Sequence, residues 1–500
     1  MFRSKIELFI KWVIYATFFV PLLVFPGSYI FPFIVPKIVF FRSLVEIMLG
    51  AYCLLLIINW REYVPKNNYL NLALLLFIFS FGVSTFAGTD AYHSFWDNHE
   101  RMLGLFTLLH YTAFYFVAQS VFKDWKDWKW ASRIFMLGGF LVMFIGWLQT
   151  QNPQLLLNNG SDRVASTLGN PIYVGGYGLF LTCLALLLIS REKDVMWKWF
   201  YGIVGFFGFM GIFWSGTRGA LLGLAVGAAY AVIVYVVVLK KYPKIRFGLL
   251  GLAILSLIGI SLLYSFRQTA FVTNLPGIGR AVNTSLSGIE DSPRWIAWQI
   301  AWQSFKEKPL FGWGPNNYFY AFNAHYNPYS LDFGYGETWF DNAHNIIMNT
   351  LAVQGAFGLL TYLVMYGAAI VVLVRAYRAQ KVDFHFVAIG GAFLVAHFVS
   401  VVTVFEDPTS YIYLMFWFAL ITVICHSRES GNLGIVNKTK DVVVAVIHPD
   451  KKISAGSISS VAFVFAIIIF IFNIQPARAN QMALDAIRAL SKDPVLGISV

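Results

Sequence analysis

Long hydrophobic runs separated by short polar stretches make up most of this 500-residue chain. Runs of about twenty apolar residues, the length that crosses the hydrocarbon core of a bilayer, predict about thirteen membrane-spanning helices. They lie at residues 8–25, 38–60, 68–88, 102–122, 130–150, 171–190, 196–214, 219–239, 246–265, 345–374, 384–404, 408–425 and 458–474. We therefore expect an all-α polytopic membrane protein with about 12 to 13 transmembrane helices.

One long polar excursion, residues 266–344, interrupts this series between the ninth and tenth predicted helices. It contains an amphipathic helix that opens at Ser292-Pro293-Arg294-Trp295, a Gly/Pro-rich turn from Pro309 to Pro315, and the cluster Asp341-Asn342-Ala343-His344-Asn345. The glycines of the turn would let its backbone approach a ligand closely. A loop of this length is more often functional than idle, so we interpret it as the active-site cap of a membrane enzyme.

The amino-acid composition excludes a soluble globular protein. The chain is 58% hydrophobic and only 12% charged, with a mean hydropathy of +0.65, so the bilayer is the solvent for most of it. Its three cysteines lie inside apolar runs and form neither a disulfide framework nor a zinc-ligand spacing. The formal net charge of +12 reflects short loops between spans, which excludes nucleic acid as a partner.

Basic residues alternate between the loops, which predicts the orientation of the chain. With the N-terminus inside, each alternate loop is basic, at Arg61 and Lys66; Lys123, Lys126 and Lys129; Arg191, Lys193 and Lys198; Lys240, Lys241, Lys244 and Arg246; Arg375, Arg378 and Lys381; Lys438, Lys440, Lys451 and Lys452. We expect the first span to stay as an anchor, because no small-residue cleavage site follows it. The long excursion and the tail after residue 474 then lie outside the cytoplasm.

The predicted spans and orientation divide the chain into six parts. They are an N-terminal transmembrane bundle (1–265), an extracytoplasmic catalytic loop (266–344), C-terminal transmembrane helices (345–425), a cytoplasmic polar insertion (426–457), a last transmembrane helix (458–474) and the start of an extracytoplasmic helical tail (475–500). Apolar residues recur at helical spacing in that tail, so we expect a helix there, with tetratricopeptide-like repeats as one possibility.

The outward loops are rich in arginine, at Arg101, Arg163, Arg218, Arg267, Arg280 and Arg294. Lysine suffices for topology, whereas the guanidinium group suits bidentate capture of phosphate oxygens. This bias predicts an anionic ligand at the outer face; the alternative is that each arginine pairs with a carboxylate or reaches the lipid headgroups. Arg218 lies in a very short turn near membrane depth, where a charge is costly without a partner.

Five motifs in order resemble the O-antigen ligase and O-antigen polymerase superfamily over residues 90–420. They are the Arg163–Tyr177 stretch with Leu168-Gly169-Asn170-Pro171, Ser215-Gly216-Thr217-Arg218-Gly219, Arg294-Trp295, Pro309-Leu310-Phe311-Gly312-Trp313-Gly314-Pro315, and Ala343-His344-Asn345 followed by Gln354-Gly355 and Gly358. The resemblance implies a GT-C-type glycosyltransferase, inverting and metal-independent, in the bacterial cytoplasmic (inner) membrane. It further implies an undecaprenyl-diphosphate-linked glycan donor at the periplasmic face. By motif, the essential residues of the family fall on His344, Arg218 and Arg294, and Arg163 joins them.

The chemistry agrees with those roles. Departure of a polyprenyl diphosphate develops negative charge, which arginines stabilise, and the acceptor hydroxyl needs a base with a pKa near neutrality, which an imidazole supplies. His344 is our candidate base and His325 the second choice; the alternative for His344 is a structural helix cap. Other candidate substrate contacts are Arg101, Asn170, Tyr173, Trp313 and Asn345. The chain contains no Asp-x-Asp motif, so we expect no metal and no cofactor.

Three acceptors remain open for such an enzyme: the lipid A core in lipopolysaccharide biosynthesis, another glycan chain as in an O-antigen polymerase, or a protein hydroxyl as in a protein O-oligosaccharyltransferase. A lipid-linked glycan transporter or flippase is the alternative from another class, since it would also combine many spans with intramembrane polar residues. A transporter would not need a long aromatic cap with a single well-placed histidine.

Overall fold

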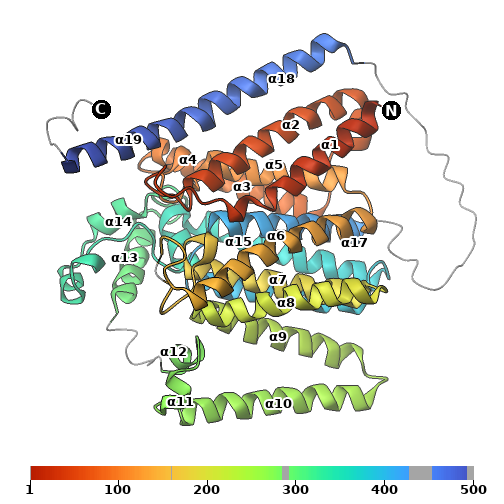
Figure 1. The fold of residues 1–500 in the computed structure, drawn as a ribbon, viewed down its shortest axis with the longest axis vertical. Helices are drawn as coiled ribbons and strands as arrows, with labels where there is room; N and C mark the ends of the chain where they lie inside the picture. The colour runs from red at the N-terminus through yellow and green to blue at the C-terminus, as the bar shows by residue number, and fades with distance from the viewer. Residues whose placement is uncertain (1, 159, 284–291, 427–452, 493–500) are drawn as a thin grey trace, which may run out of the picture.

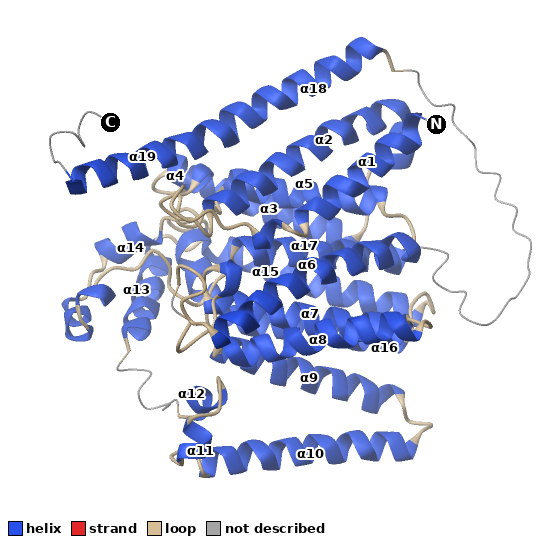
Figure 2. Ribbon diagram, in the orientation of Figure 1, coloured by secondary structure: helices blue, strands red, loops and turns tan. Residues whose placement is uncertain are grey.

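A computed structural model describes residues 2–158, 160–283, 292–426 and 453–492, and every regular element in these ranges is helical (Figure 2). Eleven helices of the described residues are at least 18 residues long and apolar enough to cross a membrane. They are α2 (Val35–Tyr63), α3 (Tyr69–Ala87), α6 (Trp125–Gln151), α7 (Pro171–Arg191), α8 (Val195–Ser215), α9 (Arg218–Val238), α10 (Pro243–Ser265), α15 (Ile346–Arg378), α16 (Phe384–Val402), α17 (Pro408–His426) and the run Ala455–Ser491.

Two further helices occupy predicted spans but are shorter, α1 (Phe2–Thr17) with 16 residues and α5 (Leu105–Val121) with 17 residues. Each of the predicted hydrophobic runs therefore corresponds to a helix, and the expected all-α polytopic membrane fold is confirmed. The GT-C type stays a prediction.

The long helices lie side by side in one bundle, with their ends gathered at two opposite faces (Figure 1). α17 is the central helix, because 94% of its apolar window is buried inside the protein. Its rings pack against those of α7 and α16, as in the close pair Phe393–Trp417, whose centroids are 4.5 Å apart. α9 and α10 lie at the edge of the bundle (Figure 1), and no residue in the apolar window of α10 is buried inside the protein, as expected for a helix that faces lipid.

Short helices fill the connection between α10 and α15 and lie at one end of the bundle (Figure 1). They are α11 (Ala270–Thr273), α12 (Ile278–Val282), α13 (Pro293–Glu307), α14 (Tyr318–Ala324), and the 3-10 helices η3 (Pro328–Phe333) and η4 (Tyr335–Glu337). We call the described residues 292–344 the cap. Other short elements are η1 (Val20–Leu22), α4 (Ala91–Trp96) and η2 (Ser166–Leu168).

α13 confirms the helix expected at Ser292-Pro293-Arg294-Trp295. The Ser292 side chain accepts a hydrogen bond from the backbone N–H of Trp295 at 3.3 Å, and Pro293 occupies the first turn, where its missing N–H costs nothing. The apolar face of α13 is buried against α14 and the first turns of α15, in a cluster that includes Ile296, Tyr318 and Val353. The cap therefore has a small hydrophobic core of its own.

The turn from Pro309 to Pro315 docks on the backbone of α15 at a kink. Gly355 has φ +67° and ψ −169°, which frees the carbonyls before it. The Trp313 and Gly314 N–H groups donate to Ala352 O and Val353 O at 3.0 and 2.9 Å. A Cβ at Gly312 would overlap the Val353 backbone. The glycines of this turn admit the backbone of α15, and the expected close approach of the turn to a ligand stays a prediction.

The last predicted span and the predicted tail form one helical run along the outside of α2 (Figure 1). α18 (Ala455–Ile469) passes through a π-helix (Phe470–Ile474) into α19 (Gln475–Lys492). Asn473, in the π-helix, is fully buried and donates to Glu46 Oε2 of α2 at 2.6 Å. The boundary predicted at residue 474 thus falls inside a helix, and most of the predicted cytoplasmic insertion, residues 427–452, lies outside the described residues.

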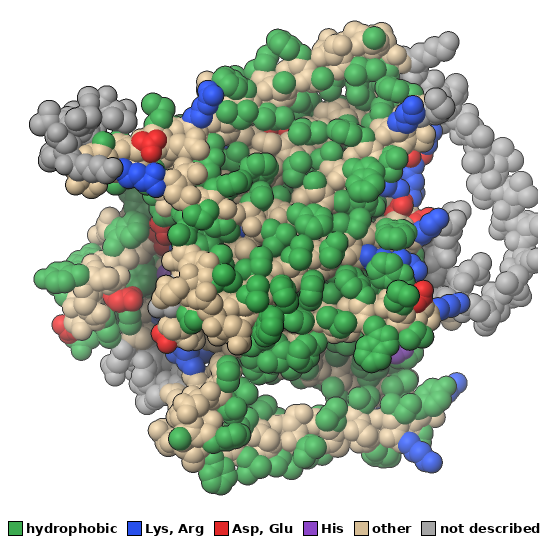
Figure 3. Space-filling model, in the orientation of Figure 1, with side chains coloured by type: hydrophobic (Ala, Val, Ile, Leu, Met, Phe, Trp, Pro, Cys, Tyr) green, Lys and Arg blue, Asp and Glu red, His purple; other side chains and the backbone are tan. Residues whose placement is uncertain are grey.

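Lysine and arginine side chains gather at the end of the bundle where the N-terminus lies, on the face seen in Figure 3. Several of them pair there with carboxylates, as Lys11 does with Asp127 at 2.6 Å. The cap lies at the opposite end (Figure 1). This separation agrees with the predicted orientation, in which the N-terminal end faces the cytoplasm.

Candidate functional site

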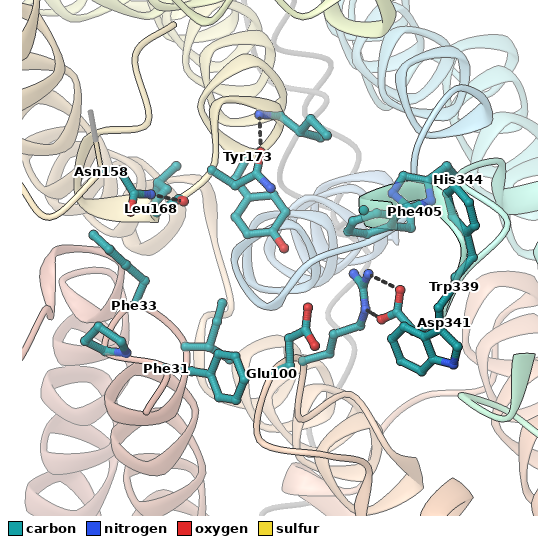
Figure 4. Close-up of a pocket in the computed structure, with 18 of the residues that line it drawn as sticks. Phe31, Phe33, Glu100, Asn158, Leu168, Tyr173, Trp339, Asp341, His344 and Phe405 are labelled. Carbon is teal, nitrogen blue, oxygen red and sulfur yellow. Dashed lines mark hydrogen bonds and ion pairs between the residues drawn. The ribbon is translucent and has the colours of Figure 1, made fainter. Parts of the chain in front are cut away.

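A cavity of about 520 Å³ opens where the cap meets the bundle (Figure 4). Its lining comes from stretches that are far apart in the chain and meet only in the fold. These are Phe31, Pro32, Phe33 and Ile34; Glu100 and Arg101; Asn158, Leu168, Gly169, Asn170, Ile172 and Tyr173; Gly336, Glu337, Trp339, Phe340, Asp341, His344 and Phe405. Aromatic rings and a few convergent polar groups are typical of a small-molecule or sugar site.

His344 stands at the junction of the cap and α15. Its own N–H donates to Asn342 Oδ1 at 2.9 Å, and the ring Nδ1 lies 2.9 Å from the Asn342 carbonyl oxygen. Because a carbonyl oxygen only accepts, Nδ1 carries the hydrogen in the neutral ring and Nε2 keeps a free lone pair. Phe405 contacts the imidazole edge-on, with centroids 5.2 Å apart. His344 therefore presents a basic nitrogen in a fixed tautomer.

The surroundings of His344 favour the neutral imidazole. Burial lowers its pKa below the ordinary value of 6.5, and the positive charges of Arg294 and Arg101 lower it further. The hydrogen bond to Asn342 and the Asp341 carboxylate act in the opposite direction without reversing the shift. At neutral pH the ring is therefore ready to accept a proton.

Arg101 is already paired. Its Nε and Nη2 both donate to the Asp341 carboxylate, the latter at 2.9 Å, and its Cζ lies 4.1 Å from the Phe405 ring centroid. Burial alone would lower the pKa of Arg101, but Asp341 outweighs burial and leaves it raised. Figure 4 shows Asp341 on the same side of the cavity as His344, with Glu100 and Tyr173 pointing into the cavity. The ion pair of Arg101 with Asp341 thus connects the loop before α5 to the cap.

Asn170 and Tyr173 stand on the opposite wall, at the start of α7. The Asn170 side chain accepts from the Ile172 N–H at 3.0 Å and caps the helix, with Pro171 in its first turn. Tyr173, one turn later, is only 9% exposed and faces the cavity (Figure 4). Both predicted contacts therefore line the cavity, and Asn170 also caps α7.

Arg163 lies beside the turn between α8 and α9. The Val164 N–H donates to Trp214 O at 3.0 Å, which brings this loop to the turn. Arg163 Nε then donates to Ser215 O at 2.8 Å, and its Nη2 donates to Thr217 Oγ1 at 3.0 Å. These bonds hold the guanidinium in one orientation at the end of the bundle.

Arg218 and Arg294 approach the same place from other elements. Arg218 is the first residue of α9, and the next residue, Gly219, is so close to α16 that a Cβ there would lie 2.8 Å from Ser400 O. Arg294, in α13, directs Nη1 toward Thr403 O at 3.4 Å, one residue past the end of α16. Three arginines from distant parts of the sequence therefore meet at the C-terminal end of α16.

The electrostatics of these groups agrees with a cluster. Burial is the largest of the effects that together lower the pKa of the Arg163 guanidinium to about 10. The other effects are three neighbouring positive charges, those of Arg280, Arg294 and Arg218. Positive charges held together in this way repel one another, so an anion that neutralises them binds favourably. Arg280 was absent from our predicted site.

The other predicted residues lie apart from the cavity lining. Trp313 Nε1 donates to Ser304 O at 3.1 Å, and Lys308 Nζ lies 4.3 Å from its ring centroid. His325 is 6.3 Å from the Trp313 ring, with Nε2 3.3 Å from Glu307 Oε1. Asn345 caps α15 by accepting from Ile347 and Met348. The placement favours His344 over His325 as the base.

Sequence reasoning left out several side chains that the fold brings into the cavity, namely Glu100, Glu337, Trp339 and Phe405, and it named Asp341 only as part of the cluster before His344. Glu337, Trp339 and Asp341 precede His344 by only a few residues, so their nearness could have been inferred. Phe405 carries no local signal. Among the described residues, no group of three or more His, Cys, Asp or Glu side chains is arranged to hold a metal ion, and metal independence stays a prediction.

The fold and the site together define a polytopic helical membrane protein with a polar cavity, a basic histidine and an arginine cluster at one end of its bundle. Residues 203–363 match the family model described as O-antigen ligase, and the match confirms the resemblance to the O-antigen ligase superfamily. The matched segment contains Arg218, Arg294 and His344 and indicates an O-antigen ligase- or polymerase-like membrane enzyme. A search of curated proteins found no match to the chain.

Proposed function

We propose that this protein transfers a glycan from an undecaprenyl-diphosphate carrier to an acceptor hydroxyl at the outer face of the cytoplasmic membrane, as an O-antigen ligase does. The observation that carries the proposal is the position of His344. Its basic Nε2 belongs to a neutral, half-buried ring on the wall of a sugar-sized cavity, and Arg294 is close enough to lower the pKa of that ring. A base and an anion site are thus neighbours.

The arginines act on the leaving group. When the bond between the anomeric carbon and the diphosphate oxygen breaks, the bonding electrons remain on the diphosphate, whose negative charge grows. Arg218 and Arg294 stabilise that charge as it develops, and Arg163, fixed by Ser215 and Thr217, adds a preorganised donor. No proton has to be delivered to the diphosphate, because the arginines supply the compensating charge.

His344 acts on the acceptor. Nε2 takes the proton of the acceptor hydroxyl while the hydroxyl oxygen attacks the anomeric carbon, and the new glycosidic bond forms as the old one breaks. A direct displacement of this kind inverts the anomeric configuration. The hydrogen bond from Nδ1 to the Asn342 carbonyl stabilises the imidazolium that results. The base is regenerated when this proton passes to solvent.

The decisive experiment uses purified protein, an undecaprenyl-diphosphate glycan and, in separate reactions, lipid A core, free glycan and a Ser/Thr peptide. We expect a covalent product with one acceptor class, with release of undecaprenyl diphosphate. His344→Ala should lower the transfer rate by roughly 10² to 10⁴-fold while donor binding remains. Movement of the glycan lipid across a vesicle membrane without a covalent product would contradict the proposal and favour a transporter.

A further inference from the structure

α11 and α12 form a short helical pair between the end of α10 and the cap. Most of this pair is exposed, but Val272 is only 2% exposed and Gly279 is also buried. The Thr269 hydroxyl caps α11 by accepting from the Val272 N–H at 3.5 Å. Neither helix lines the cavity of Figure 4, so the pair has no role in the mechanism described so far.

The start of α12 packs directly on the turn that carries the arginine site. Gly277 has φ +71°, and a Cβ built on it would lie 2.8 Å from Phe213 O and 3.4 Å from Gly216 Cα. The stem of Arg163 passes the other side of the same turn, with Cγ 3.5 Å from a Cβ built on Gly216. The α8–α9 turn is thus flanked by Arg163 and by α12, and only glycine permits the second contact.

Arg280 stands three residues after Gly277, on α12, and its side chain is exposed. The positive charge of Arg280 acts on arginines of two other parts of the site. Of the three neighbouring charges that lower the pKa of Arg163, the charge of Arg280 has the largest effect. Arg280 also lowers the pKa of Arg294 on α13. Arg280 therefore belongs to the arginine cluster, in agreement with the packing of α12 on the α8–α9 turn.

We propose that Arg280 is a further diphosphate-binding residue, carried to the anion site by the packing of α12 on the α8–α9 turn. The inference rests on the proposed function, because it takes the polyprenyl diphosphate as the ligand. A diphosphate has more phosphoryl oxygens and more negative charge than a monophosphate, so each added guanidinium group has more acceptors on a diphosphate. Arg280 joins Arg163, Arg218 and Arg294 in a site that distinguishes a diphosphate from a monophosphate.

The test compares binding of undecaprenyl diphosphate and undecaprenyl monophosphate to the full-length protein in detergent. Wild type should bind the diphosphate more tightly. Arg280→Ala should weaken diphosphate binding on the order of tenfold and monophosphate binding much less, because a charge-assisted contact to one phosphoryl group is lost. Arg280→Lys should recover part of this loss, since it keeps the charge but not the planar fork.

Arg267→Ala is the matched control. Arg267 belongs to the same connection and loses the same charge, but its guanidinium lies 4.3 Å from the Tyr264 ring centroid and donates to Tyr264 O at 3.1 Å. Its diphosphate affinity should equal that of wild type. Gly277→Ala is a second, independent variant: its Cβ would push α12 off the turn and should reproduce the selective loss seen with Arg280→Ala.

If Arg218→Ala and Arg294→Ala weaken diphosphate binding but Arg280→Ala and Gly277→Ala leave both affinities unchanged, the role of Arg280 is overturned and the proposed function stands. If none of the four variants changes either affinity, the anion site itself is overturned, and with it the proposed function. An equal loss on both lipids in Arg280→Ala would assign Arg280 to general charge attraction and overturn the selectivity.

Discussion

At the scale of single residues, Asn342 determines what His344 can do. Its side chain accepts from the His344 N–H and its carbonyl accepts from Nδ1, so one residue sets both the backbone and the tautomer of the histidine. The backbone of His344 is held at φ +53°, a conformation that is uncommon outside glycine and costs about 1 kcal/mol or more. Strain of this kind is retained where a precise side-chain position matters.

The first prediction concerns pH. Transfer should require neutral His344, so the rate should fall as pH decreases through the pKa of this group, which burial and two arginines hold below 6.5. Arg294→Gln removes one of the charges that lower this pKa, and the acidic limb of its residual activity should therefore move to higher pH. Rate profiles between pH 4 and 8 would measure both. A rate that increases toward low pH would instead indicate a protonated His344 that binds the diphosphate.

The second prediction concerns the pair Arg101–Asp341, whose side chains are 15% and 13% exposed. Asp341→Asn leaves a largely buried guanidinium without its counter-charge, which should reduce the free energy of local opening around Asp341–Asn345 by about 3 kcal/mol. Hydrogen exchange of these backbone amides would measure the change. The double variant Arg101→Met with Asp341→Leu should lose much less; an equal loss in both would show that the pair is not what holds the cap.

At the scale of secondary-structure elements, the kink of α15 joins the membrane bundle to the cap. A Cβ on Gly355 would overlap the Leu310 carbonyl, and its positive φ is unfavourable for other residues. The Ala356 N–H donates to Pro309 O at 2.8 Å on the far side of the kink. The kink therefore has a definite cause, the insertion of another backbone into the helical hydrogen-bond ladder.

The third prediction tests this joint. Gly355→Ala should lower the free energy of unfolding of the purified protein by at least about 2 kcal/mol, measured by thermal denaturation. The causes are backbone strain and separation of the turn from α15. Gly367→Ala is the control in the same helix, because a Cβ there meets nothing within 4 Å. It should be neutral or stabilising by up to about 1 kcal/mol, from helix propensity. Equal effects of the two substitutions would contradict a special role for Gly355.

Hydropathy predicted the membrane helices well, because a bilayer imposes the same length and polarity on each of them. It did not predict the π-helix at Phe470–Ile474 or the α11–α12 pair, since both depend on packing against distant residues, Glu46 in the first case and the α8–α9 turn in the second. The glycines of Pro309–Pro315 predicted that another group approaches the backbone of this turn closely. The sequence did not indicate whether that group is a ligand or a helix.

At the scale of the whole molecule, the two ends of the bundle differ in chemistry, and this difference predicts the orientation. The fourth prediction uses Tyr335→Cys in the cap, where the side chain is 92% exposed, and Tyr242→Cys between α9 and α10, where it is 60% exposed. An impermeant thiol reagent should label Cys at 335 in intact cells and Cys at 242 only after lysis. The wild type, whose three native cysteines lie in the spans, is the blank. The reverse pattern would invert the topology.

The candidate site could be predicted in part. Motif resemblance indicated His344, Arg163, Arg218 and Arg294, and the fold brings these four together although more than 180 positions separate the first from the last. The motifs could not indicate that Arg101 forms an ion pair with Asp341 or that Trp313 lies beside His325. Those relations arise from the docking of the cap, which no local pattern encodes.

The docking of the cap on α15 also has a consequence for how the protein is made. The turn Pro309–Pro315 leaves the ribosome before its partners Ala352, Val353 and Ala356, so its backbone hydrogen bonds have no acceptors or donors until that part of α15 has been synthesised. A chain arrested between the turn and α15 therefore carries Arg163, Arg218 and Arg294 but lacks the helix on which the turn docks.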